Sequence, residues 1–156
     1  MKYTTISVVA VVAMFLASCG GGETKQDANV PDATAKEEVK EEAYDPMTDK
    51  GIGPISSLTL GEVDQAMADA GKEKFETLCA ACHKLDKRFV GPPMAGVTER
   101  RTPEWIMNMI LNPEEMVQKN EAARNLLMEY SAPMANQNLT EEEARSVLEY
   151  FRTIDQ

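Results

Sequence analysis

Two cysteines and a histidine stand together near the middle of the chain, in the run Cys79-Ala80-Ala81-Cys82-His83. Two thiols three positions apart lie on one side of a helical turn, where both can add to the vinyl groups along one edge of a porphyrin. The histidine that follows can offer a neutral imidazole to an iron held in that ring. The spacing therefore predicts one covalent haem c, with Cys79 and Cys82 as its links and His83 as an iron ligand.

Three other kinds of site use the same residue types. A closed zinc site needs four ligands, and the chain has one histidine and three cysteines, the third of them far from the motif. A thioredoxin-like redox pair follows a strand in a βαβ unit, whereas this pair follows a helical pattern. A plain disulfide between the two cysteines is possible by spacing but would have no evident role. Haem attachment is favoured over all three.

The second axial ligand of the iron cannot be another histidine of this chain, because there is only one. Methionine is the other common choice in c-type cytochromes, and Met/His ligation raises their reduction potential. Met134 follows Pro133 in a stretch without helical pattern, and a loop can cross to the ring face opposite His83 more easily than a helix interior can. We expect His83 and Met134 to bind the iron. Met94 is the runner-up, and an iron without a second protein ligand is the remaining alternative.

The residues around these ligands have the pattern of short helices. Thr102-Pro103-Glu104 combines an N-cap, a proline at the first helical position and an acid in the first turn. Asn112-Pro113 repeats that signal, Asn120 is a further candidate cap, and Thr140 to Glu143 reads as a capping box. No stretch alternates with a period of two, so the fold class is all-α, with four or five short helices and long loops.

The apolar content of this helical part is modest. The chain has 156 residues, of which 6% are aromatic, and a domain of about 95 residues buries only about 60–65% of its unfolded surface. A large apolar cofactor would complete such a core, in agreement with the motif.

The N-terminus has the pattern of an export signal. Lys2 precedes an apolar run, Ile6 to Leu16, which is too short to span a bilayer. The run ends in Leu16-Ala17-Ser18-Cys19, which resembles a bacterial lipoprotein signal; an ordinary signal peptide is the alternative. The resemblance implies that residues 1–18 are removed, that Cys19 is lipidated, and that the protein is extracytoplasmic, anchored to a bacterial membrane and facing the periplasm.

The remaining chain divides by composition. Residues 19–50 are rich in acidic side chains and poor in bulky apolar ones, which predicts a flexible linker. Residues 51–61, which include Ile52, Ile55, Leu58 and Leu60, are expected to form a strap over the domain at 62–156 or to remain loose.

From about residue 70 onward the sequence resembles a class I c-type cytochrome. Gly71 and Phe75 stand where that family packs its first helix on its last, and Val147 and Tyr150 resemble the matching contacts. Gly91-Pro92 followed by Met94 is similar to the family's Gly-Pro-x-Leu. The resemblance implies a cytochrome c-like fold around one covalent haem, Pro92 as the carbonyl that accepts the His83 N–H, and Met134 as the axial thioether. Pro93 leaves open which proline carbonyl serves.

Three further positions have two interpretations each. Trp105, the only tryptophan, either lines the haem pocket or packs in the core. Arg100 and Arg101 either neutralise the haem propionates or lie in a solvated loop. The cations Lys84, Lys87 and Arg88 either form a docking rim for an acidic partner or balance local charge.

The most consistent function is transfer of single electrons, not catalysis. The net charge of −10 and a pI near 4.6 argue against nucleic acid as a partner. We expect a membrane-tethered monohaem carrier between extracytoplasmic redox proteins of a respiratory chain, for example a dehydrogenase, a terminal oxidase or a nitrogen-oxide reductase. The alternatives are a haem-bearing accessory subunit of a larger respiratory complex, and a haem enzyme or sensor with an open iron position.

Overall fold

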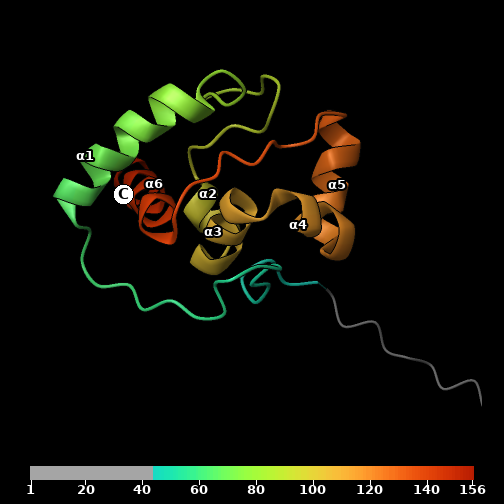
Figure 1. Ribbon diagram of the computed structural model, residues 1–156, viewed down its shortest axis with the longest axis horizontal. Coiled ribbons are helices and arrows are strands. Elements are labelled where there is room, and N and C mark those ends of the chain that lie inside the picture. Colours follow the sequence, from blue (N-terminus) through green and yellow to red (C-terminus); the bar gives the residue numbers. More distant parts are fainter. Residues whose placement is uncertain (1–43) are drawn as a thin grey trace, which may run out of the picture. The chain divides into compact units, whose positions relative to one another are not determined.

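The computed structural model describes residues 44–156, and within them it is built from helices and loops without a strand (Figure 1). The all-α class is therefore confirmed, with six α-helices where four or five were expected. The predicted signal at 1–18, Cys19 and most of the predicted linker lie outside the described residues. The elements are α1 (Gln65–Lys74), the π-helical turn η1 (Phe75–Cys79), α2 (Val97–Arg100), α3 (Pro103–Leu111), α4 (Pro113–Lys119), α5 (Glu121–Tyr130) and α6 (Glu141–Ile154).

Side-chain caps begin most of the longer helices. The Thr102 hydroxyl accepts from Trp105 N at 3.1 Å at the start of α3, and Asn120 Oδ1 accepts from Ala123 N at 2.9 Å at the start of α5. Thr140 and Glu143 form the predicted capping box of α6. Asn112 departs from expectation, because its side chain donates to Glu115 Oε2 instead of capping α4.

The first and last helices, α1 and α6, pack against each other (Figure 1). A Cβ added at Gly71 would lie 1.9 Å from the backbone oxygen of Ser146, so this close approach requires glycine. The ring of Phe75 packs on Tyr150 and Phe151, with both centroid distances 5.7 Å. The helix pairing implied by the family resemblance is present.

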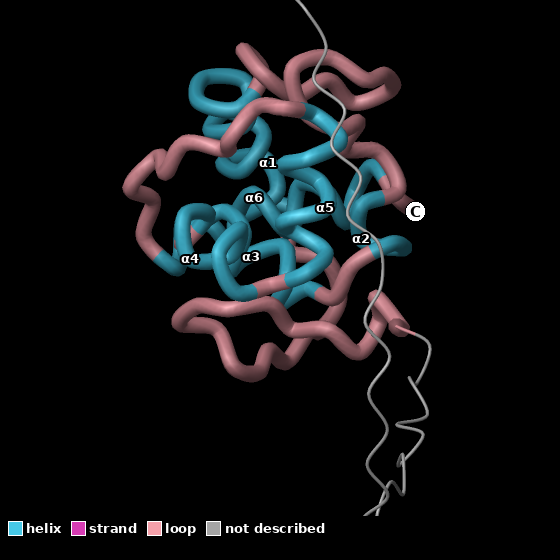
Figure 2. Tube along the Cα trace, turned by 90° about the vertical axis from the view of Figure 1, so that its right-hand side faces the viewer, coloured by secondary structure: helices cyan, strands magenta, loops and turns pink. Residues whose placement is uncertain are grey.

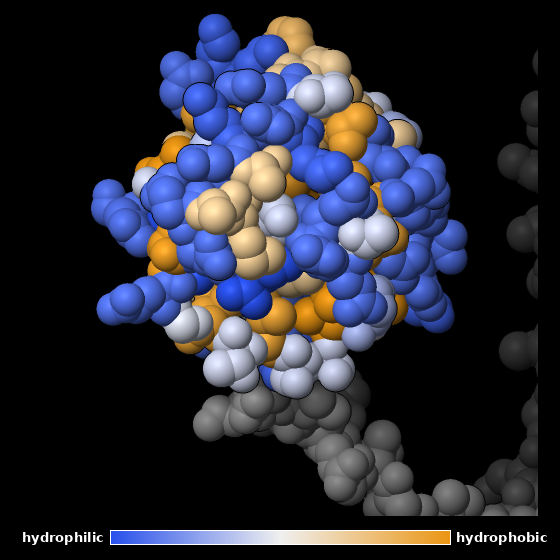
Figure 3. All heavy atoms as spheres, turned by 60° about the vertical axis from the view of Figure 1, so that its left-hand side comes forward, coloured by the Kyte–Doolittle hydropathy of each residue, from blue (hydrophilic) through white to orange (hydrophobic). Residues whose placement is uncertain are grey.

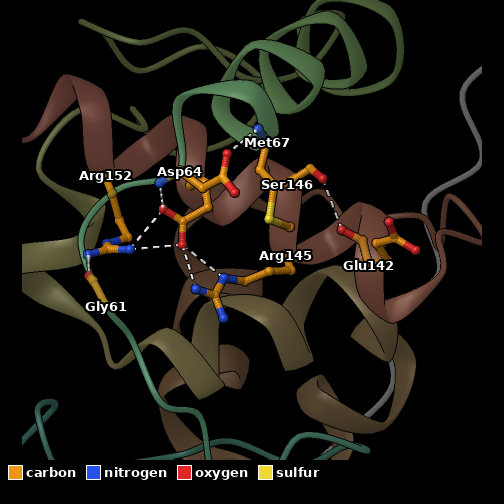
Figure 4. A network of polar contacts seen from close by, with 8 residues as sticks. Gly61, Asp64, Met67, Glu142, Arg145, Ser146 and Arg152 are labelled. Atoms are coloured by element: carbon orange, nitrogen blue, oxygen red, sulfur yellow. Dashed lines mark hydrogen bonds and ion pairs between the residues drawn. The ribbon is translucent and has the colours of Figure 1, made fainter.

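A buried carboxylate joins the start of α1 to α6. Glu149 is fully buried, and its oxygens accept from Arg145 and Arg152 at 2.7–2.9 Å and from Asp64 N at 3.3 Å. Arg152 also donates to Gly61 O, so these groups converge on the chain entering α1 (Figure 4). The guanidinium groups of Arg145 and Arg152 offset the desolvation of the Glu149 carboxylate. Removal of either the carboxylate or its arginine partners would leave buried charge uncompensated and so would destabilise the fold.

The strap, residues 51–61, runs along α3 and α4 (Figures 1 and 2). Ile55 is buried, and Ile52, Leu58 and Leu60 pack against the core. Asn108 of α3, 1% exposed, accepts from Ile55 N and donates to Ile55 O and Lys50 O, each at 2.9 Å. One buried amide therefore satisfies three backbone groups of an extended segment.

Contacts with the helices begin before the strap. Asp49, which the composition assigned to the end of the linker, accepts from Asn120 Nδ2 at 2.8 and 2.9 Å and from Gly51 N at 2.8 Å. Burial raises the pKa of the Asp49 carboxyl, but these donors and the Tyr44 hydroxyl outweigh it, so the pKa lies below its usual value. Asp49 thereby holds the amide that caps α5.

The surface is mixed. The face seen when the α1 side is turned forward is mostly hydrophilic, with apolar residues between (Figure 3). Over residues 44–156, none of the helices is both long and apolar enough to cross a membrane.

Candidate functional site

A single cleft collects the residues that the sequence singled out. It lies between the segment that contains His83, the helices α4 and α5, and the loop between α5 and α6, and it is lined mainly by apolar side chains. Its lining residues include Leu78, Cys79, Cys82, His83, Val90, Gly91, Pro92, Val117, Leu126, Leu127, Tyr130, Pro133, Met134 and Gln137.

The two cysteines sit where the first helix ends. The backbone widens into η1 at Phe75–Cys79, closed by the bond from Ala80 N to Phe75 O at 2.9 Å. Such π-turns occur frequently at functional sites. Cys82 N then donates to Cys79 O at 3.0 Å, which places both thiols on one turn. The thiols are free, Cys79 half-buried and Cys82 exposed.

The environment of Cys79 does not activate its thiol. Burial raises the pKa of Cys79, and the neighbouring Cys82 raises it further. A redox-active or nucleophilic cysteine has the opposite shift, towards the thiolate. Cys79 therefore lacks the lowered pKa that is typical of a thioredoxin-like redox centre.

The imidazole of His83 is oriented by a proline carbonyl. His83 Nδ1 lies 3.1 Å from Pro92 O. A carbonyl can only accept, so this contact requires the proton on Nδ1 and leaves the lone pair on Nε2. The carbonyl of Pro93 is occupied elsewhere, because it accepts from Arg100 at 3.0 Å.

Glycine is required beside that ring. A Cβ at Gly91 would lie 2.5 Å from His83 Cε1 and 2.8 Å from Nδ1. Main-chain bonds hold the same segment on both sides of the histidine, from Gly91 N to Cys82 O at 2.9 Å and from Met94 N to Lys84 O at 3.0 Å. The imidazole is thus fixed by backbone, not by mobile side chains.

Met134 reaches the same cleft from the loop between α5 and α6, and its side chain is half-buried against the core. Cys79, Cys82, His83, Pro92 and Met134 are therefore brought together. Met94, the runner-up, packs against the core and is absent from the cleft lining. One wall of the cleft was not assigned to the site from the sequence. It is formed by Val117, Leu126, Leu127 and Tyr130. The apolar spacing within residues 126–130 was the only sequence signal for it.

The cleft fits a haem c. Most of its lining side chains are apolar, as is usual for cofactor sites. Its lining includes two thiols, an imidazole and a thioether, the donors that c-type haem uses. Within residues 44–156 no group of three or more His, Cys, Asp or Glu side chains is arranged to hold a metal ion directly.

The secondary candidates have other roles. Trp105 is buried in the core and donates to Asn120 Oδ1 at 3.2 Å, away from the cleft. Arg101 lies over the Trp105 ring and donates to Tyr44. Neither Trp105 nor the two arginines lines the cleft.

Two of the three cations in the expected docking rim are engaged within the chain. Arg88 pairs with Glu129 at 2.5 Å and stacks on the Tyr130 ring, 3.9 Å from its centroid. Lys84 donates to Ala80 O at 2.6 Å. Lys87 has no such contact among the described residues. Only Arg88 of the three is paired with a carboxylate, because the neutral Ala80 carbonyl leaves the charge of Lys84 in place.

Comparison with known proteins gives a consistent picture. The sequence model of the family described as cytochrome c matches residues 68–155. The cytochrome c-type cyt cy of Rhodobacter capsulatus is 52% identical over 46 residues, which is 26% of this chain and 23% of that protein. The chain thus spans about a quarter of that curated relative.

Solved structures resemble a larger part of the chain. A cytochrome c from Rhodothermus marinus is 46% identical with a TM-score of 0.64, covering 65% of this chain and 89% of that one. An engineered form of it, bound to a carbene intermediate, is 46% identical with a TM-score of 0.61 over the same shares. A cytochrome c domain from Pseudomonas putida is 27% identical with a TM-score of 0.50, covering 53% and 85%.

Proposed function

Since the chain belongs to the cytochrome c family, whose members bind haem c covalently and carry electrons, we propose that it is a monohaem electron carrier. It exchanges single electrons with extracytoplasmic redox proteins of a respiratory chain and is tethered to a bacterial membrane through Cys19. The observation that carries the proposal is the convergence of two thiols, one imidazole and one thioether on a single apolar cleft.

Each site residue has one task in this proposal. Cys79 and Cys82 would hold the haem by thioether bonds, and His83 and Met134 would bind its iron. Pro92 O keeps the proton on His83 Nδ1, which raises the donor strength of the other ring nitrogen. When bound, the haem supplies one-electron exchange at its iron.

The protein sets the potential of that exchange through its ligands and surroundings. A thioether opposite an imidazole favours the reduced iron relative to two imidazoles. The apolar lining from α4 and α5 would keep water from the ring and lower the local dielectric. A low dielectric disfavours the oxidised iron, which has one more positive charge than the reduced iron.

The tether is supported by the N-terminal motif alone. The lipobox-like run ending at Cys19 and the acidic stretch after it would hold the domain near membrane-bound donors and acceptors, and so raise their effective concentration.

The proposal is tested on the chain purified from a host with haem c maturation machinery. We expect an intact mass that includes one covalent haem and lipid on Cys19, and a c-type reduced spectrum. Cys79→Ser with Cys82→Ser should abolish the covalent haem, while Cys19→Ser should keep the haem and release the protein from membranes. A chain that exports without covalent haem would contradict the carrier function.

A second candidate, chemistry at an open iron position, is favoured by one observation. The loop that contains Met134 has no backbone hydrogen bonds between residues 132 and 139 with other backbone groups of the described chain, so its thioether is the easier ligand to displace. An engineered relative is described as bound to a carbene intermediate. Turnover of peroxide or nitrogen oxides by the wild-type protein would favour this candidate.

A further inference from the structure

The Met134 loop, residues 131–140, connects α5 to α6 with little support from its own backbone (Figure 1). Among the described residues, its hydrogen bonds from backbone to backbone are confined to its ends, where Ser131 N donates to Leu127 O and Thr140 O accepts from Ala144 N. Met134 and Leu139 pack on the core. Packing excludes water but does not fix the direction of a thioether, so its orientation depends on side-chain contacts.

One side chain ties this loop to another helix. Asn136 Nδ2 donates to Leu111 O at 3.1 Å, and Asn136 Oδ1 accepts from Asn138 N at 2.8 Å. Among the described residues this is the one hydrogen bond from 132–139 to a different element. The amide nitrogen of Asn136 thus contacts α3, and its amide oxygen contacts the backbone of its own loop. Asn138, which donates to that oxygen, adopts a left-handed conformation with φ 55°.

The partner of Asn136 is a fixed point. Leu111 is the last residue of α3, and the carbonyls at a helix end have no partner within the helix. The helix itself is held by its packing on α6 and by the Asn108 contacts to the strap. An acceptor on a rigid element, bound two residues after Met134, restricts the positions that the thioether can take.

We propose that Asn136 is the positioning residue for the axial thioether of Met134. It latches the Met134 loop to the C-terminal end of α3 and so holds the sulfur toward the iron. The inference rests on the proposed function, because it needs a haem in the cleft and Met134 as its ligand. Without the latch the loop keeps its packing, but the thioether leaves the iron more often.

The test uses the full holo-protein, reduced, with carbon monoxide as the probe. Asn136→Asp keeps an acceptor for Asn138 N but loses the donor to Leu111 O, and Asn136→Ala loses both. Asn138→Gly is the matched control, because its exposed side chain makes no hydrogen bond in the structure and glycine suits its φ. We expect both Asn136 variants to bind carbon monoxide at least about tenfold faster than wild type, and the control to stay within about twofold.

Two further readouts separate positioning from general loosening. The reduction potential should fall in both Asn136 variants, and hydrogen exchange should rise within 131–140 while the α1 and α6 amides remain protected. Exchange that rises throughout the domain would indicate lost stability and overturn a positioning role.

The remaining outcomes are also decisive. Suppose that the wild type resists carbon monoxide, and that the binding rates and reduction potentials of both Asn136 variants equal those of wild type. That result would overturn the role of Asn136 but not the ligation by Met134. A faster rate in Asn136→Ala but not in Asn136→Asp would assign the effect to the turn at Asn138 and not to Leu111. A wild-type protein that binds carbon monoxide at once would contradict Met134 ligation itself, and the latch with it.

Discussion

His83 and Met134 line the same cleft from segments that are held in different ways. His83 stands between two main-chain bonds, its ring contacts the Pro92 carbonyl, and Gly91 leaves no room for the ring to move. Met134 stands in a loop whose one hydrogen bond to another helix, within residues 44–156, comes from the side chain of Asn136. Backbone contacts therefore hold the His83 side of the cleft in place, whereas a side-chain contact holds the Met134 side.

This difference predicts which ligand is permanent and which is exchangeable. Backbone bonds persist through most substitutions, so the His83 side is set once the chain folds. A loop with a single amide latch opens at a lower cost. We infer that substitutions on the His83 side change whether the cofactor is assembled, whereas substitutions on the Met134 side change its potential and ligand affinity.

The largest expected effect is the loss of holo-protein in His83→Ala. Without the imidazole, the iron has no ligand on the backbone-held side, and we expect the yield of c-type protein to fall below a tenth of wild type, whereas Met134→Ala matures normally. Absorbance per mole of purified chain measures the two yields. Equal yields would break the comparison between the two sides.

Gly91→Ala should be the next largest. Its Cβ would lie 2.5 Å from the His83 ring, which the Pro92 contact prevents from moving away. We expect a loss of about 1–3 kcal/mol in the free energy of unfolding. Gly61→Ala is the control, because no atom of the described part of the chain lies within 4 Å of a Cβ built at Gly61. Denaturant unfolding of the two holo-proteins checks this, and equal stabilities would mean that the ring is less confined than the contacts indicate.

The smallest expected effect concerns Asp49, which supports the α5 wall through Asn120. Its pKa is lowered in the folded state, so its contribution is fully present above the unfolded value of about 3.9 and is lost as pH falls through the folded pKa. Asp49→Asn should therefore melt below wild type at neutral pH, and the difference in melting temperature should narrow as the pH falls from about 4 through the folded pKa. Thermal melts from pH 2.5 to 7 measure the gap. A gap independent of pH would show that the charge is not what matters.

Much of the helical layout was predictable because its signals are local. Thr102, Asn120 and Thr140 cap their helices as expected, and the Cys79 to His83 spacing specified one turn of structure. The four-residue helix α2 was missed, because so short a segment has no periodicity. It begins after Gly96 with φ 75°, and Asp155 holds it through Thr98 N, 57 positions away.

The contacts that position the site were the least predictable. Asn108 meets Ile55 across 53 positions and Asn136 meets Leu111 across 25. Nothing local distinguishes these asparagines from solvated ones. The role of Trp105 was open for the same reason, since its partner Asn120 was visible in the sequence only as a helix cap.

The most direct test of the central claim is the absorption spectrum of the reduced holo-protein with and without carbon monoxide, for wild type and Met134→Ala. A closed His83/Met134 site predicts a wild-type spectrum that carbon monoxide does not change on mixing, and a clear shift in Met134→Ala together with a lower reduction potential. A wild-type spectrum that shifts at once, or a Met134→Ala variant with unchanged potential, would contradict it.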